Sequence, residues 1–273
     1  TVSVCSETAF TVTPAGVPAG TTYTWTAPLV TGGMTGGSAQ VTGVGSISQV
    51  LINSTATPQT ATYTVIPSSG GCVGDPFTVT VTVNPNAAIS LTSASSTASQ
   101  TVCINTPITG ITYSVGSGGT GATVTGLPSG VVGSFVGGVF TITGTPTISG
   151  TFNYTVTTTG GCASASLTGT VAVSATPTAA NAGPDQNVNI SSSNTTITLA
   201  GNSAAIGAGT WTKVSGPASG TFTNINSNNT TVTGLAPGAY VFRWTISNGA
   251  CASVSDDVTI TINTTPTINN FSK

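Results

Sequence analysis

The sequence Phe77-Thr78-Val79-Thr80-Val81-Thr82-Val83 alternates strictly between an apolar residue and threonine. Because successive side chains of a β-strand point to opposite faces of the sheet, this alternation predicts a strand with one buried face. Comparable strands are predicted at residues 167–173 and 258–262. A short segment with proline follows each of the three strands, and proline cannot continue a β-ladder. Each strand therefore ends a domain, and the connectors that follow are residues 84–86, 175–178 and 264–267.

Around these strands the sequence repeats with a period near 90 residues. Each repeat opens with a short strand-like motif, at residues 3–5, 101–103 and 187–189, and closes with a small turn that carries a cysteine. Units of this length are typical of immunoglobulin-sized β-sandwiches rather than of solenoid repeats. We predict an all-β chain of three tandem β-sandwich domains, at residues 1–86, 87–176 and 177–266, with a linker or the start of a next domain at 267–273. Short connectors stiffened by proline predict an elongated array.

The composition excludes several classes of function. Of 273 residues, 57 are threonine, 3 are basic, 5 are acidic and none is histidine. Such a chain has no basic surface for nucleic acid, and it lacks most groups used in acid–base catalysis and in zinc sites. Helix formers are scarce, and no apolar run reaches the roughly 18 residues of a membrane-spanning helix. We expect no enzyme, no catalytic residues and no membrane insertion.

The five cysteines predict disulfides within the repeats. Cys5 with Cys72, and Cys103 with Cys162, would each join the opening motif of a repeat to its last hairpin. The third repeat has Asn189 at its opening position, which leaves Cys251 as an unpaired thiol, either the remnant of a lost disulfide or a reactive or intermolecular cysteine. Paired cysteines favour an oxidising compartment. Because the sequence begins directly in strand-like residues without a signal peptide, we expect a processed protein or a piece of a longer one.

Three acidic residues are weak candidates for a calcium site. Asp256 and Asp257 are adjacent in a predicted strand, so their side chains should point to opposite faces, and Asp185 could approach them. Carboxylates and carbonyls are the ligands that calcium prefers, but no motif with the spacing of a calcium loop is present. The alternative is that all three are solvated residues at strand ends. No other metal or cofactor is predicted.

The aromatic residues have two interpretations. Trp25 and Trp211 lie about 20 residues after the start of their repeats, where a sandwich keeps its central buried tryptophan, and Trp244 aligns with Tyr63 and Tyr154 of the other repeats. A sugar-binding surface would instead need exposed aromatic rings with polar partners. The aromatic residues outside the repeating pattern, and so the candidates for that role, are chiefly Tyr23 and Tyr113.

Several stretches also resemble known families of bacterial surface repeats. Residues 126–130, 138–146 and 149–156 resemble the Ig-like, cadherin-related repeat of large bacterial surface proteins. The third repeat is similar to the PKD-like domains of Bacteroidetes cell-surface proteins, and the first repeat, at Gly71-Cys72 and residues 76–81, resembles the same family. The matching residues of the third repeat are 182–186, 199–202, 211, 215–217 and 235–240. Asn189 departs from the family, where a cysteine is expected.

The resemblance implies a function as well as a fold. Members are typically long secreted adhesins, including those of gliding filaments, which the type IX system exports through a separate C-terminal signal domain. We predict a structural stalk segment of an extracellular adhesin or filament at the bacterial cell surface, with adhesion or gliding as its role. Its expected partners are the neighbouring repeats of the same long chain. Surface glycans and other copies of the chain stay open as additional partners. The alternative is a glycan-binding accessory module of a secreted surface protein or polysaccharide-degrading enzyme.

Overall fold

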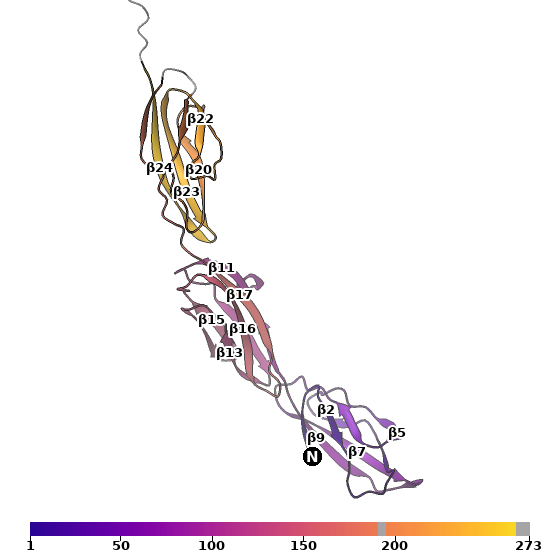
Figure 1. Cartoon of the computed structure of the whole chain (residues 1–273). Coiled ribbons are helices and arrows are strands. Elements are labelled where there is room, and N and C mark those ends of the chain that lie inside the picture. The colour runs from indigo at the N-terminus through magenta and orange to yellow at the C-terminus, as the bar shows by residue number, and fades with distance from the viewer. Residues whose placement is uncertain (191–194, 266–273) are drawn as a thin grey trace, which may run out of the picture. The chain divides into compact units, whose positions relative to one another are not determined.

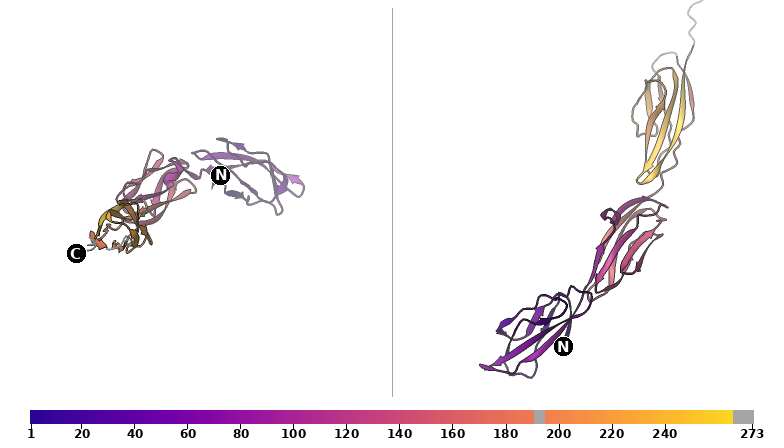
Figure 2. Two further views of the ribbon diagram at one scale, coloured as in Figure 1. Left: turned by 90° about the horizontal axis from the view of Figure 1, so that it is seen from above. Right: turned by 180° about the vertical axis from the view of Figure 1, so that it is seen from behind.

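The computed structural model describes residues 1–190 and 195–265, which form β-strands and one short 3-10 helix, η1 (Ser95–Ala98) (Figure 1). The chain divides into two compact units. One contains Thr1–Gln100, Thr109–Gly144 and Phe152–Val171, and the other contains Thr101–Ile108, Thr145–Thr151 and the described residues from position 172 onward. No described helix is long and apolar enough to cross a membrane. The two further views of the ribbon show the same strand-built layers from other sides (Figure 2).

The first sandwich packs a large sheet against a two-stranded one. The alternation predicted at residues 77–83 is confirmed, because Val79, Val81 and Val83 are buried while Thr78 is exposed. Trp25 and Tyr63 meet edge to face in the core, with ring centroids 6.2 Å apart. The large sheet has the order β1 (Val2–Cys5), β9 (Phe77–Asn84), β7 (Gln59–Ser69), β3 (Thr22–Trp25) and β5 (Gln40–Val44), with β4 (Leu29–Val30) and β8 (Cys72–Val73) paired to β7, and the small sheet is β2 (Ala9–Val12) with β6 (Ile47–Val50).

The opening strand β1 runs parallel to the last strand β9, and this orientation decides where its cysteine lies. The register pairs Val2 with Val81 and Cys5 with Asn84. The third sandwich repeats the arrangement, since its opening and last strands are also parallel and pair Asn189 with Asn263. In a parallel pair both strands end at the same edge, so the residue at the end of the opening strand lies beside the start of the connector.

The second sandwich consists of two four-stranded sheets. Tyr113 and Tyr154 come from different sheets and are both buried, and their hydroxyl groups lie 2.9 Å apart in a hydrogen bond. The Tyr154 hydroxyl also donates to the carbonyl of Ala98. One sheet is β10 (Ala87–Leu91), β12 (Ile111–Ser117), β15 (Val139–Gly144) and β14 (Val131–Val136), and the other is β11 (Ser99–Cys103), β17 (Ser166–Ser174), β16 (Gly150–Gly160) and β13 (Gly119–Thr125).

The third sandwich is built around two buried indoles. Trp211 and Trp244 are each 1% exposed, and their ring centroids are 5.0 Å apart. Both ring N–H groups donate to backbone carbonyls, that of Trp211 to Ser227 at 3.1 Å and that of Trp244 to Asn202 at 3.2 Å. The sheets are β18 (Gln186–Ile190), β24 (Cys251–Thr264), β23 (Gly238–Asn248) and β20 (Ala208–Ser215), and β19 (Thr195–Thr198), β22 (Thr231–Leu235) and β21 (Thr221–Phe222).

Stability should depend on pH mainly in the alkaline range. Burial raises the pKa of Tyr63 to about 12, and burial together with the hydrogen bond between its hydroxyl and that of Tyr113 raises the pKa of Tyr154. A tyrosine that ionises at about pH 10 in the unfolded chain but higher in the folded one favours unfolding as pH rises. We expect a nearly constant Tm between about pH 5 and 9 and a falling Tm above about pH 10. Calorimetry across this range checks the expectation, with Tyr63→Phe as the variant in which the alkaline decline is smaller.

Candidate functional site

The two disulfides join successive sandwiches, and the predicted pairing is wrong. Cys5 is bonded to Cys162 with a Cα–Cα distance of 5.3 Å, and Cys103 is bonded to Cys251 at 4.6 Å. Cys251, predicted to be the unpaired thiol, is therefore engaged, while Cys72 is free and exposed.

The parallel opening strand explains why the predicted pairs cannot form. Cys5 lies beside Asn84 at the end of β9, whereas Cys72 precedes the start of the same strand. A strand of this length separates them by roughly 25 Å, at about 3.3 Å per residue. Disulfides need Cα atoms within about 7 Å. The same separation divides Cys103 from Cys162, since Cys103 lies at the end of β17 and Cys162 precedes its start.

Both opening cysteines are held in the same turn. The amide of Thr8 donates to the carbonyl of Cys5, and the amide of Thr106 donates to that of Cys103, each at 3.1 Å. Within the two turns, Glu7 and Asn105 adopt left-handed conformations with φ of 66° and 61°. The residue after each cysteine bonds to the last residue of the final strand, because Ser6 donates to the Asn84 carbonyl at 2.8 Å and Ile104 to the Ser174 carbonyl at 2.9 Å. The cysteine is thus fixed at the start of the connector.

The hairpin of the second sandwich receives that connector. We call the disulfide Cys5–Cys162, with connector residues 84–87, the first clamp. The amide of Cys162 donates to the carbonyl of Pro85 at 2.9 Å, and the amide of Ala87 donates to the carbonyl of Ala163 at 2.8 Å. Gly118, in the turn between β12 and β13, donates to the carbonyl of Asn86 at 3.1 Å. Three backbone hydrogen bonds therefore accompany the disulfide and leave the connector little freedom.

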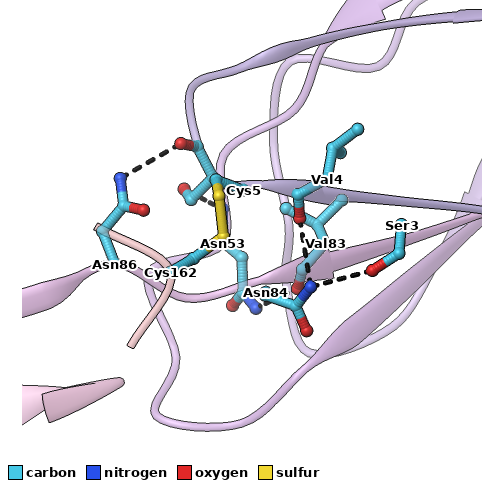
Figure 3. The surroundings of a disulfide bond; sticks show 9 residues. Ser3, Val4, Cys5, Asn53, Val83, Asn84, Asn86 and Cys162 are labelled. Carbon is cyan, nitrogen blue, oxygen red and sulfur yellow. Dashed lines mark hydrogen bonds between the residues drawn. A yellow bond between two sulfur atoms is a disulfide. The ribbon is translucent and has the colours of Figure 1, made fainter. Parts of the chain in front are cut away.

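Asparagine side chains complete the first clamp (Figure 3). The Asn86 amide donates to the carbonyl of Ser6 at 3.0 Å, and the Asn84 amide donates to the Ser3 hydroxyl at 2.9 Å. Asn53, only 4% exposed, donates its side-chain amide to the carbonyls of Val83 and Thr57. Its backbone amide donates to the Ser6 hydroxyl at 2.9 Å. A buried amide with satisfied donors fixes the surrounding loops in one geometry. Sequence reasoning missed these residues, and the only signal was the asparagine on both sides of Pro85.

The second clamp is the disulfide Cys103–Cys251 with connector residues 174–178. The side-chain amide of Asn248 donates to the carbonyl of Ala175 at 2.8 Å, and the amide of Ala250 donates to the Ser174 hydroxyl at 3.1 Å. The amide of Thr178, at the end of the connector, donates to the carbonyl of Ile206 at 3.0 Å. Both clamps thus combine a disulfide from the opening strand with polar contacts from the next hairpin to the connector, although the residues that make the contacts differ.

The three acidic candidates for calcium are each engaged elsewhere. Asp256 accepts a hydrogen bond from the amide of Ala182 at 2.8 Å, and Asp185 accepts one from the amide of Thr259 at 2.7 Å. Asp257 forms a two-point ion pair with Arg243, at 2.7 and 2.9 Å. This guanidinium lowers the pKa of the Asp257 carboxyl. Across residues 1–190 and 195–265, no group of three or more acidic or cysteine side chains could hold a metal ion. Calcium binding stays an untested prediction.

The aromatic side chains form cores rather than a binding surface. Trp25, Trp211 and Trp244 are buried, which confirms the core interpretation. Tyr23 and Tyr113, the candidates for an exposed sugar platform, are only 2% and 1% exposed, so that interpretation is wrong for them. In the part of the chain that the structure describes, no tryptophan, tyrosine or phenylalanine side chain is more than partly exposed.

The disulfide pattern predicts how many thiols each variant carries. Under denaturing, non-reducing conditions we expect one titratable thiol in the wild-type chain and none in Cys72→Ser, because that substitution removes the only free cysteine. Cys251→Ser should carry two thiols, because it releases Cys103. Titration with a chromogenic disulfide measures these numbers. Two thiols in Cys72→Ser and none in Cys251→Ser would instead establish pairing within the repeats.

Comparison with known proteins supports the fold. Residues 2–87 match the PKD-like domain family, and residues 182–262 match the K319L-like PKD domain family. The structure is similar to the N-terminal eight Ig domains of Down Syndrome Cell Adhesion Molecule, with a TM-score of 0.58 and 12% identity over 96% of this chain and 35% of that chain. The chain therefore spans about a third of that eight-domain chain.

Two further solved structures align with the chain at lower scores. The I-band fragment I67-I69 from titin has a TM-score of 0.49 and 16% identity, over 96% of this chain and 95% of that chain. The PKD domain from KIAA 1837 protein has a TM-score of 0.29 and 29% identity, over 34% of this chain and 92% of that chain. Among curated proteins, none matches this chain. The chain is an all-β protein of tandem Ig-like and PKD-like domains, a class typical of extracellular proteins, and neither matching family is an enzyme family.

Proposed function

We propose that this chain is a structural, non-catalytic segment of a secreted bacterial cell-surface adhesin or filament. It bears tension between the cell and a more distant binding part. The observation that carries the proposal is that each disulfide joins one sandwich to the next beside the connector, rather than closing a loop within one sandwich.

The physical argument concerns the connectors. Successive domains joined by a few residues normally move relative to each other, because the interface between them is small. Here a disulfide joins the two sandwiches beside each connector, and several hydrogen bonds hold the connector itself. A ligand-binding module gains nothing from such joints, whereas a segment under tension does, because a disulfide does not yield at forces that unfold a sandwich. Disulfides also persist outside the cytoplasm, which supports secretion.

The glycan-binding alternative lacks a supporting feature in the described residues. Sugar sites usually stack the ligand on exposed aromatic rings, and the described aromatic side chains are buried or only partly exposed. Adhesion or gliding as the biological role, an origin in Bacteroidetes and export by the type IX system rest on the sequence resemblance alone. This role, this origin and this export route are therefore proposed rather than read from the fold.

A replacement experiment in the producing bacterium tests the proposal. Deleting residues 1–273 from the surface protein should abolish attachment, and three unrelated β-sandwiches of similar length that are joined by disulfides in the same way should restore it, because a spacer under tension depends on its length and its joints rather than on its own surface. The disulfide-free variant with all five cysteines changed to serine is the matched control and should attach less firmly under flow. Failure of the unrelated sandwiches to restore attachment, while the wild-type segment does, would contradict a spacer role.

A second arm examines binding directly. The purified chain, with and without calcium, is applied to a glycan array at micromolar concentration, and we expect no reproducible signal. Binding to one class of polysaccharide would replace the proposed spacer by a lectin-like module.

A further inference from the structure

Cys72 occupies the position in the first sandwich that the bonded cysteines occupy in the other two. It follows a two-residue hairpin turn and pairs with Ser69, as Cys251 pairs with Asn248. The turn before it, Gly70-Gly71, has φ of 57° and 83°, and the turn before Cys162, Gly160-Gly161, has φ of 77° and 71°. The three hairpins are therefore equivalent, and the first is the one whose cysteine is free.

A hollow lies beside Cys72. Its volume is about 340 Å³, and it is bounded by the loop between β2 and β3 and by the hairpin at residues 67–74. Its lining includes Val17, Pro18 and Pro67 together with Val73. Val17 is 42% exposed and Val73 is 74% exposed, so the rim of the hollow is apolar.

The equivalent place in the second sandwich holds the connector, and a hollow of about 390 Å³ that is lined in part by Pro85, Gly118 and Cys162 remains beside it. There the turn between β12 and β13 and the hairpin at Cys162 enclose connector residues 85–87, which are held by the three backbone hydrogen bonds of the first clamp. The fit is close, because a Cβ atom on Gly118 would lie 2.5 Å from the Pro85 carbonyl oxygen, and one on Gly161 would lie 2.8 Å from the Ala87 amide nitrogen. The equivalent loops of the first sandwich are the loop between β2 and β3 and the hairpin at residues 67–74, and no connector lies between them.

We infer that Cys72 and the adjoining hollow receive the connector and the opening-strand cysteine of a further repeat, which precedes Thr1 in the same polypeptide. The hollow takes the connector, and Cys72 forms a third clamp with the cysteine. Formation of the bond oxidises two thiols to one disulfide and releases two protons. The two electrons pass to the disulfide of a thiol–disulfide oxidoreductase in the export compartment, as for the two clamps present.

The order in which the two observed disulfides join the repeats indicates that the partner of Cys72 lies in a preceding repeat. In both clamps the hairpin cysteine is bonded to the opening cysteine of the repeat immediately before it in the sequence. A second copy of this chain has no opening cysteine to offer, because Cys5 and Cys103 are bonded and the third repeat has Asn189. A second copy could contribute only its own Cys72, which would join two hairpins.

Disulfide mapping on the natural polypeptide tests the inference. The protein is purified from the producing cells in N-ethylmaleimide without reductant and digested with pepsin at acidic pH, which suppresses disulfide exchange. Mass spectrometry should find the Cys72 peptide linked to a peptide that precedes Thr1. A Cys72 that carries maleimide, that is linked to Cys72 of another copy or that is linked to a different protein would overturn the inference.

A pair of variants made in the producing cells provides the control. Cys72→Ser should leave one maleimide-labelled cysteine in the sequence before Thr1, whereas Cys251→Ser should leave that cysteine bonded and label Cys103 instead. Labelling of no new cysteine in Cys72→Ser would contradict the third clamp. Since these readouts do not involve attachment, they are independent of the proposed spacer function.

Discussion

Pulled from its two ends until fully extended, the oxidised chain should reach only about one third of the length of the reduced chain. The shortest covalent path runs from Thr1 to Cys5, through the first disulfide to Cys162, back along the chain to Cys103, and through the second disulfide to Cys251. This path contains about 85 residues, or roughly 30 nm at about 3.5 Å per residue. After reduction all 273 residues extend, to roughly 95 nm at the same spacing.

Single-molecule force spectroscopy measures this difference as contour length. The double variants Cys5→Ser with Cys162→Ser, and Cys103→Ser with Cys251→Ser, each keep one disulfide and should reach an intermediate length of roughly 40–45 nm at the same spacing per residue. Pairing within the repeats would give roughly 50 nm for the oxidised wild-type chain instead. A wild-type value near that length, or near the reduced length, would contradict the clamps.

Gly209→Val should destabilise the third sandwich more than any exposed substitution in the same strand. A Cβ atom at Gly209 would lie 2.0 Å from Trp244 Cζ2, and this ring has no room to move, because it packs on Trp211 and its N–H group bonds to Asn202. Overpacking of a core costs about 1–3 kcal/mol and occasionally more, and the complete loss of a buried tryptophan side chain costs about 3–5 kcal/mol. We expect a loss of about 3 kcal/mol or more and a fall in Tm of more than about 10 °C.

Calorimetry with tryptophan fluorescence separates this effect from changes elsewhere. Val214→Ala in the same strand is the matched control, because Val214 is 49% exposed and its truncation should change the free energy of unfolding by less than about 0.5 kcal/mol. The transition of the first sandwich should be the same in both variants. A Gly209→Val protein with a third-sandwich Tm within about 2 °C of wild type would show that the indole pair is not tightly packed.

The sandwiches themselves could be predicted from the sequence because burial imposes a period of two residues along each strand. The alternation at residues 77–83 and the recurring tryptophan positions follow from this rule. The same rule, applied more strictly, would have placed Tyr23 in the core, because it lies two residues before the buried Trp25 in one strand. Tyr113 stands in the same relation to the buried Ile111. The prediction that the two tyrosines are exposed did not take into account the core residue two positions away in each strand.

The disulfide pairing could not be predicted by counting cysteines. Pairing within repeats and pairing between repeats both give two disulfides and one free thiol, and they differ only in whether Cys251 or Cys72 is left over. The direction of the opening strand decides between these two pairings. A parallel strand places Cys5 at the connector end of its sandwich, whereas an antiparallel one would have placed it near the hairpin. Residue spacing alone carries no information about that direction.

The overlap of the two disulfide loops has a further effect outside the cell, where proteases attack exposed chains. One loop spans residues 5–162 and the other spans residues 103–251. Every peptide bond between Cys5 and Cys251 therefore lies inside at least one loop, including both connectors. A single cut anywhere in that span leaves the two fragments covalently joined. A chain built in this way can be cut once by a protease in this span without releasing the parts that lie beyond the cut.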